Sequence, residues 1–387
     1  MKNTVCRIEK TAGNTAYARN SSLDILRIVC MFLIVLGHAM VHGHVLETVS
    51  TDHANYYLVN ILRTFLSIHV NCFVLISGYF LCTHKFRLSR PFSIWGQSFF
   101  WSLALYLLLC FGRVIPFDIA SFAKACLPFT QQRYWFVTTY LLMYALTPLL
   151  NAAIRAMNQR QHAWFLTIFF IIYIALQNLF FWEKFTSTNS YDPLFFAFLY
   201  MIAAYFRLYP AKKTKRWYIL CYCLACTFSA VWKIGVAWLT RKIFGEVMGD
   251  NLFLSYSSIT MVFASACLFR FFEGLNVVDV VSRKPVRLLS SLTFGIYLIH
   301  EQPEIRTFLW SSLLRPEDYA RSPALIPLLL GMALLVFSSC AVLEYFRQRI
   351  SKRMSTKKLI EGVSNRITRV GITLTECVFR LEHKEDR

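Results

Sequence analysis

Charged residues are scarce in this sequence of 387 residues, since Asp, Glu, Lys and Arg together make up only 16% of it. Hydrophobic residues make up 56%, and the mean hydropathy is +0.46. A soluble domain is about half apolar and about a quarter charged, so this composition excludes an ordinary soluble protein. The 35 Phe, 19 Tyr and 9 Trp suit helices that face lipid and end in interfacial aromatic belts. We therefore expect an all-α polytopic membrane protein.

Familiar catalytic and linker signatures are also absent. The sequence contains no serine-hydrolase elbow, Walker loop, zinc-ligand spacing or dinucleotide-binding fingerprint. No internal repeat stands out, and no Gly/Ser-rich or Pro-rich linker divides the chain. Twelve Cys are present, but most lie in apolar runs, where Cys behaves as a small hydrophobe. The cluster of Cys221, Cys223 and Cys226 has no nearby His or carboxylate, so we expect no metal site.

Apolar runs long enough to cross a bilayer as helices occur about ten times. If the N-terminus is cytoplasmic, the inner loops hold twelve Lys or Arg, whereas the outer loops hold eight over nearly twice the length. We therefore expect a multi-pass protein of the cell (inner) membrane with both termini in the cytoplasm. The runs cover about residues 22–42, 57–82, 92–112, 134–150, 163–182, 193–209, 217–239, 252–272, 288–310 and 324–346.

The formal net charge of +20 follows the same topology. Lys and Arg gather in the expected inner loops and in the last 40 residues, where they can attract anionic lipid headgroups, so the charge does not indicate nucleic-acid binding. We expect a cytoplasmic tail at 1–21, a transmembrane domain at 22–346 and a basic cytoplasmic tail at 347–387. That last tail is either an amphipathic helix on the inner leaflet or disordered.

The first apolar run carries three residues that lipid should exclude: Asp24, Arg27 and His38. Asp24 and Arg27 are three residues apart and can pair, which lowers the cost of burying either. Arg27 and His38 are eleven residues apart, so they return to nearly the same face of a helix, separated by roughly 16 Å along its axis. A snorkelling ion pair with an interfacial histidine is the alternative to a site, but Gly37 beside His38 favours an interior face.

Other polar residues in the expected spans have both a structural and a functional interpretation. Ser77-Gly78 in the second span is typical of close helix packing, and Trp135 at the start of the fourth is typical of an interfacial anchor. In the ninth span a histidine precedes a carboxylate, which can orient an imidazole, although adjacent residues point about 100° apart. Candidates for contacting a substrate are Arg63, His69, Ser77, Tyr79, Trp135, His300 and Glu301.

Four sequence blocks resemble those of the acyltransferase family 3 integral-membrane enzymes. The first helix of that family carries an arginine followed, after ten residues, by a histidine, with an aspartate three residues before the arginine. The resemblance runs in order from about residue 20 to 346, with ten spans as in the family. The similar blocks here are SLDILRIVCMFLIVLGHA with Asp24, Arg27 and His38, FVLISGYF (Phe73–Phe80), YWFVTTYLLMYALTPLLN (Tyr134–Asn151) and LTFGIYLIHE (Leu292–Glu301).

The resemblance implies an O-acyltransferase that moves an acyl group, usually acetyl from acetyl-CoA, onto hydroxyls of exported polysaccharides or glycolipids. It implies a catalytic set of His38, Arg27 and Asp24, with acyl-CoA as co-substrate, no bound cofactor and no metal. His38 would act either as general base or as carrier of the acyl group. A non-enzymatic transporter or glycan-export protein is the alternative, because scattered intramembrane charge also suits a permease.

Overall fold

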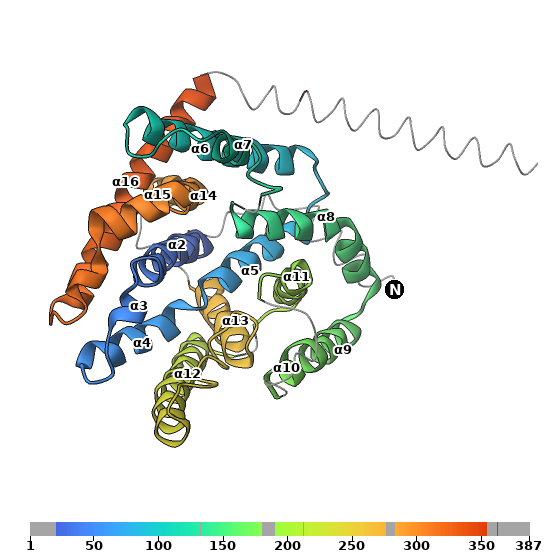
Figure 1. Cartoon of the computed structure of the whole chain (residues 1–387). Coiled ribbons are helices and arrows are strands. Elements are labelled where there is room, and N and C mark those ends of the chain that lie inside the picture. Colours follow the sequence, from blue (N-terminus) through green and yellow to red (C-terminus); the bar gives the residue numbers. More distant parts are fainter. Residues whose placement is uncertain are drawn as a thin grey trace, which may run out of the picture.

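The computed structural model describes residues 21–131, 133–179, 190–211, 213–275, 283–353 and 362. These residues form helices joined by short turns and contain no β-strand (Figure 1). The all-α polytopic membrane fold predicted from composition is therefore confirmed. The α-helices are α2 (Ser21–Val41), α3 (Val45–Thr48), α4 (Ala54–Leu66), α5 (His69–Leu81), α6 (Ser89–Phe111), α7 (Ile119–Cys126), α8 (Trp135–Ala156), α9 (Gln159–Phe170), α10 (Leu176–Leu179), α11 (Pro193–Leu208), α12 (Lys215–Phe244), α13 (Ile259–Glu273), α14 (Arg283–His300), α15 (Pro303–Thr307) and α16 (Leu325–Arg353).

A helix or a series of helices lies in each of the ten apolar runs. In the run 252–272 the helix begins only at Ile259, and residues 180–182 of the run 163–182 lie outside the described residues. Six segments of the described chain are long and apolar enough to cross a membrane: α2, α4 with α5, α6, α8, α12 and α16. The number of crossings and the orientation in the membrane remain predictions. Helix α16 extends seven residues past the expected end of the transmembrane domain at 346, and most of the expected tails lies outside the described residues.

Two of the expected spans are interrupted. Between α4 and α5, the hydroxyl of Ser67 donates to the carbonyl of Arg63 at 2.9 Å, a local bond that competes with regular helix geometry. After α14, Gln302 caps the next helix by accepting from the Ile305 amide at 2.7 Å, and Pro303 occupies the first turn of α15. Both interruptions fall close to polar residues of the candidate site.

Helix α2 lies in the middle of the assembly, between α14 and α16 on one side and α5 on the other (Figure 1). On its far side α5 packs against α11, and a Cβ added at Gly78 would lie only 2.9 Å from the Tyr200 Cα. The close packing predicted at Ser77-Gly78 is thus present, because only glycine permits this approach of the two backbones.

A buried polar cluster joins α16 to α6. The carboxylate of Glu344 is fully buried and accepts hydrogen bonds from Trp101 Nε1 at 2.9 Å and Gln97 Nε2 at 3.2 Å. Arg347 adds two further donors, at 2.7 and 2.8 Å, and completes an ion pair. Gly295 of α14 provides the space, since a Cβ there would lie 2.2 Å from the Glu344 carboxyl carbon. The cluster holds three helices in register without facing the cavity described below.

Candidate active site

One end of α2 is fixed to α14 through Asp24 and Arg27. Arg27 Nη1 lies 3.1 Å from the Asp24 carboxylate and 3.1 Å from the hydroxyl of Ser290, and that hydroxyl donates to Asp24 at 2.8 Å. The pairing predicted from the spacing of three residues is confirmed. Ser290 was not predicted, because it lies more than 260 residues along the chain and only the packing of α14 on α2 brings it near.

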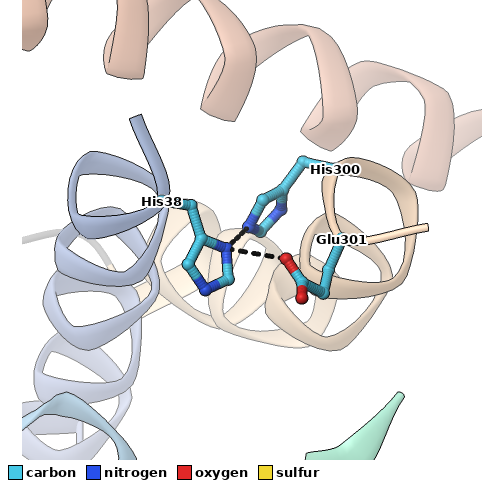
Figure 2. Close-up of side chains that lie close together, drawn as sticks. All are labelled: His38, His300 and Glu301. Carbon is cyan, nitrogen blue, oxygen red and sulfur yellow. Dashed lines mark hydrogen bonds and ion pairs between the residues drawn. The ribbon is translucent and has the colours of Figure 1, made fainter. Parts of the chain in front are cut away.

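At the other end of α2, His38 meets two residues of the ninth apolar run. Its Nδ1 lies 3.0 Å from His300 Nε2 and 3.0 Å from a carboxylate oxygen of Glu301 (Figure 2). His300 and Glu301 are adjacent in sequence but both point at the same atom of His38. Helix α14 ends at His300, and the Glu301 amide still donates to the carbonyl of Tyr297 at 3.1 Å, so the side chains of both residues extend from the end of this helix toward α2.

The hydrogen bonds assign a proton to each imidazole. His300 Nδ1 lies 2.6 Å from the carbonyl oxygen of Ile296, which can only accept, so Nδ1 carries the hydrogen. In neutral His300, Nε2 is then an acceptor. His38 Nδ1 therefore donates to His300 Nε2, which leaves a lone pair on His38 Nε2. Glu301 Oε2 lies 3.0 Å from the same Nδ1 but accepts no hydrogen bond from the described residues. That second nitrogen points away from both partners (Figure 2).

Basic neighbours complete the surroundings of Glu301. Its second oxygen accepts from Arg306 Nη1 at 2.8 Å, and His42 Nε2 lies 3.6 Å from the oxygen that faces His38. Sequence analysis missed both basic residues. His42 follows His38 by one helical turn and could have been found from that spacing, whereas Arg306 belongs to the helix after the Pro303 break.

A cavity of about 1170 Å³ connects the two ends of α2. Arg27 lines it at one end and His38 at the other, so the two residues that the helix spacing places on one face do open onto a single space. Of the remaining candidates, Arg63, His69, Ser77, Trp135 and Glu301 also line the cavity. Asp24 and His300 do not line it, but each contacts a residue that does.

Three candidates differ from their expected surroundings. Tyr79 lies away from the cavity, where its ring packs on Phe269 and under the guanidinium of Arg207 at 4.7 Å. Trp135 faces the cavity and meets Tyr191 edge to face at 4.5 Å, an arrangement that the expected interfacial anchor does not require. His69 is buried, yet its Nδ1 makes no hydrogen bond, which is unlike a satisfied core histidine.

The residues around His38 also form a possible ligand set for a metal ion. One ligand atom from each of His38, His300 and Glu301 lies within 4.8 Å of the others. Two histidines and one carboxylate are ligands that zinc uses in enzymes. Zinc would require His38 Nδ1 to lose its proton, whereas the hydrogen bond to His300 Nε2 is made with that proton in place. Glu301 Oε2 accepts no hydrogen bond from the described residues, so the absence of a metal stays a prediction.

Comparison with known proteins gives the family. No curated protein and no solved structure matches the chain. Residues 20–345 match the model of the family described as acyltransferase domain, over a range that contains α2 to α15, most of α16 and every residue of the candidate site. The matched range exceeds half of the chain and agrees with the resemblance seen in the four sequence blocks. The chain therefore belongs to acyltransferase family 3 and is a membrane acyltransferase.

Proposed function

We propose that this enzyme moves an acyl group, most simply acetyl, from acyl-CoA to a hydroxyl of an exported glycan or glycolipid. The observation that carries the proposal is the single cavity that joins Arg27 to the free ring nitrogen of His38. A cavity of this volume is large enough for a drug-sized substrate. With the predicted topology, its Arg27 end faces the cytoplasm, where acyl-CoA is made.

Arg27 supports donor binding at that end. Its guanidinium is held by Asp24 and Ser290, so the donor groups of the fork are ordered before a ligand arrives. A planar guanidinium can bind phosphate oxygens through two parallel hydrogen bonds. The rise of roughly 16 Å from Arg27 to His38 is comparable with an extended pantetheine arm, so a CoA held near Arg27 can present its thioester near His38.

His38 then acts as general base. Its Nε2 takes the proton of the acceptor hydroxyl while the hydroxyl oxygen attacks the thioester carbonyl. When the tetrahedral intermediate collapses, the carbon–sulfur bond breaks and His38 returns the proton to the CoA thiolate. Glu301 lies against Nδ1 and stabilises the imidazolium that forms between these steps, while His300 fixes the ring orientation.

In a second mechanism for the same reaction, His38 attacks the thioester itself. The acyl group would then bond to Nε2, CoA would leave as thiol, and the acceptor hydroxyl would take the acyl group in a second step. The same tautomer serves both mechanisms, because each needs a lone pair on Nε2. An acyl-histidine trapped by rapid acid quench in the absence of acceptor would separate the second mechanism from the first.

The test is a transfer assay with the purified protein in lipid nanodiscs. Acetyl-CoA and a glycan acceptor are supplied together, thiol release is followed with a chromogenic reagent, and the acceptor is examined by mass spectrometry. We expect one thiol released for each acetyl unit gained by the glycan. Protein that leaves acetyl-CoA intact but carries labelled glycan across a proteoliposome membrane would instead be a transporter.

A further inference from the structure

The cavity continues past His38 toward Arg63 on α4. The loop that follows the His38 end of α2 leads through α3 into α4, so the start of α4 lies at that same end. His69 is level with Gly37, because a Cβ added to Gly37 would lie 3.7 Å from His69 Nε2. Arg63 lies in the last turn of α4, before the break that precedes His69, and thus on the side of His69 that leads back to the His38 end.

Arg63 has no counter-ion of its own in the described part of the chain. The other two arginines that line the cavity are paired, Arg27 with Asp24 and Arg306 with Glu301. Asp250 is near enough to attract Arg63 electrostatically, but it already holds Lys233 at 2.7 Å. This end of the cavity thus carries one positive charge in excess, on a half-buried guanidinium.

An unpaired and partly desolvated guanidinium costs free energy that a protein core does not require. It does suit a ligand that brings its own negative charge, since the planar fork matches a carboxylate or phosphate. In the proposed function the thioester reacts at His38 on α2, so the anion that pairs with Arg63 on α4 belongs to a part of the substrate that does not react.

Three aromatic rings form the wall beside Arg63. Trp135 and Tyr256 lie nearly parallel, with centroids 6.3 Å apart and planes 17° apart, and Tyr191 stands perpendicular to both. All three rings line the cavity, and Arg63 is close enough to interact with both tyrosines. Flat aromatic faces pack well against the apolar C–H face of a sugar ring, as they do against other apolar ligand surfaces.

Hydrogen-bonding groups border the same wall. Asn251 and Ser255 line the cavity next to Tyr256, and His69 offers a buried Nδ1 that has no hydrogen-bond partner among the residues that the structure describes. His69 also packs against Tyr256 at 5.6 Å between ring centroids and thus lies between the aromatic wall and α2. Polar groups that converge around an aromatic surface orient a hydroxylated ligand rather than a lipid tail.

We infer that the acceptor is an anionic saccharide whose carboxylate or phosphate pairs with Arg63. Its sugar ring lies against Trp135, Tyr191 and Tyr256, and the hydroxyl to be acylated reaches His38. This inference rests on the proposed function, to which it adds the charge of the acceptor and the place where it binds.

The test compares acceptors that differ in one group: methyl glucoside, methyl glucuronide and glucose 1-phosphate. Wild-type enzyme should use at least one anionic acceptor ten- to a hundredfold better than the neutral one, the range expected for a charge-assisted bidentate contact. Arg63→Gln should remove this preference by lowering transfer to the anionic acceptors toward the rate measured with methyl glucoside, and Arg63→Lys should keep part of it. Arg321→Gln, which changes an exposed arginine outside the cavity, is the matched control.

Two results would overturn the inference. One is equal use of neutral and anionic acceptors by the wild-type enzyme, or a preference that Arg63→Gln leaves intact. The other is an increase in KM for acetyl-CoA in Arg63→Gln with no change for the acceptor, which would assign the guanidinium to the donor. The relative efficiency of carboxylate and phosphate acceptors identifies the anion that the site takes.

A binding measurement without acyl-CoA separates this inference from the proposed reaction. Calorimetric titration of the purified protein with methyl glucuronide and glucose 1-phosphate should show binding that weakens at least tenfold in Arg63→Gln. If such binding is found but no acceptor is ever acylated, the proposed function fails and the anionic saccharide site stands. If a saccharide is acylated but no binding depends on Arg63, the proposed function stands and the anionic saccharide site fails.

Discussion

Replacement of Glu301 by Gln tests the chemistry at His38 with the smallest change of shape. The amide keeps the size of the side chain, but it removes the negative charge that lies 3.0 Å from His38 Nδ1. The charge matters when His38 holds the proton of the acceptor. A unit charge at that distance is worth about 5 kcal/mol at an effective dielectric constant of 20.

Arg306 reduces this contribution. Its guanidinium contacts the other oxygen of the same carboxylate at 2.8 Å and offsets part of the field at His38. A loss of about 2–4 kcal/mol in transition-state stabilisation remains, which corresponds to a fall in kcat of about 30- to 1000-fold. Loss of the acidic partner in serine-protease triads costs about 10⁴-fold, so this range is moderate.

The assay is the thiol-release rate at saturating acetyl-CoA and acceptor, with purified protein of equal folded fraction. Glu47→Gln is the matched control, because it removes a carboxylate that is 77% exposed and pairs only with the exposed His44. Activity of Glu301→Gln within twofold of the wild-type rate would refute the role of the carboxylate. It would leave His300 as the single partner that orients His38.

Three further predictions follow from other contacts. Arg27→Lys should lower kcat/KM for acetyl-CoA about tenfold in the same assay, because the ammonium cannot reproduce the planar fork; an unchanged value would reduce Arg27 to an anchor for α14. Glu344→Gln should lower the free energy of unfolding by about 2–4 kcal/mol, because it leaves Arg347 and the Trp101 indole poorly paired. A melting temperature in detergent equal to that of the control Glu47→Gln would contradict this prediction. Prolonged treatment with a metal chelator should leave the rate of acyl transfer within twofold of the untreated rate, because His38 Nδ1 holds a proton. Stoichiometric zinc in the purified protein, together with loss of activity on its removal, would instead assign the cluster of His38, His300 and Glu301 to a metal.

Hydropathy predicts where the helices of this protein lie because each must satisfy its backbone inside an apolar run. It does not predict the breaks at Ser67–Ile68 and after His300, since these depend on single side-chain bonds and on a proline. The second break matters for function. It starts a new helix that carries Arg306, whose guanidinium contacts Glu301 beside His38.

Some residues of the site can be predicted from their spacing on one helix, whereas others depend on which distant helices pack together. The spacing of Arg27 and His38 on one helix is enough to predict that both face one space, because the α-helical period is fixed. Tyr79 does not line that space, because its ring packs on Phe269 and against the guanidinium of Arg207. Ser290, Arg306 and the Glu344 cluster could not be predicted, since each depends on which helices pack together.

The central claim is that His38 performs the transfer, and one variant tests it most directly. His38→Ala, reconstituted in nanodiscs beside wild-type protein of equal melting temperature, is supplied with acetyl-CoA and a saccharide acceptor, and the acetylated product is counted by mass spectrometry. The account predicts no acetylated product above the uncatalysed background. Product formed by His38→Ala at a rate within tenfold of the wild-type rate would contradict it.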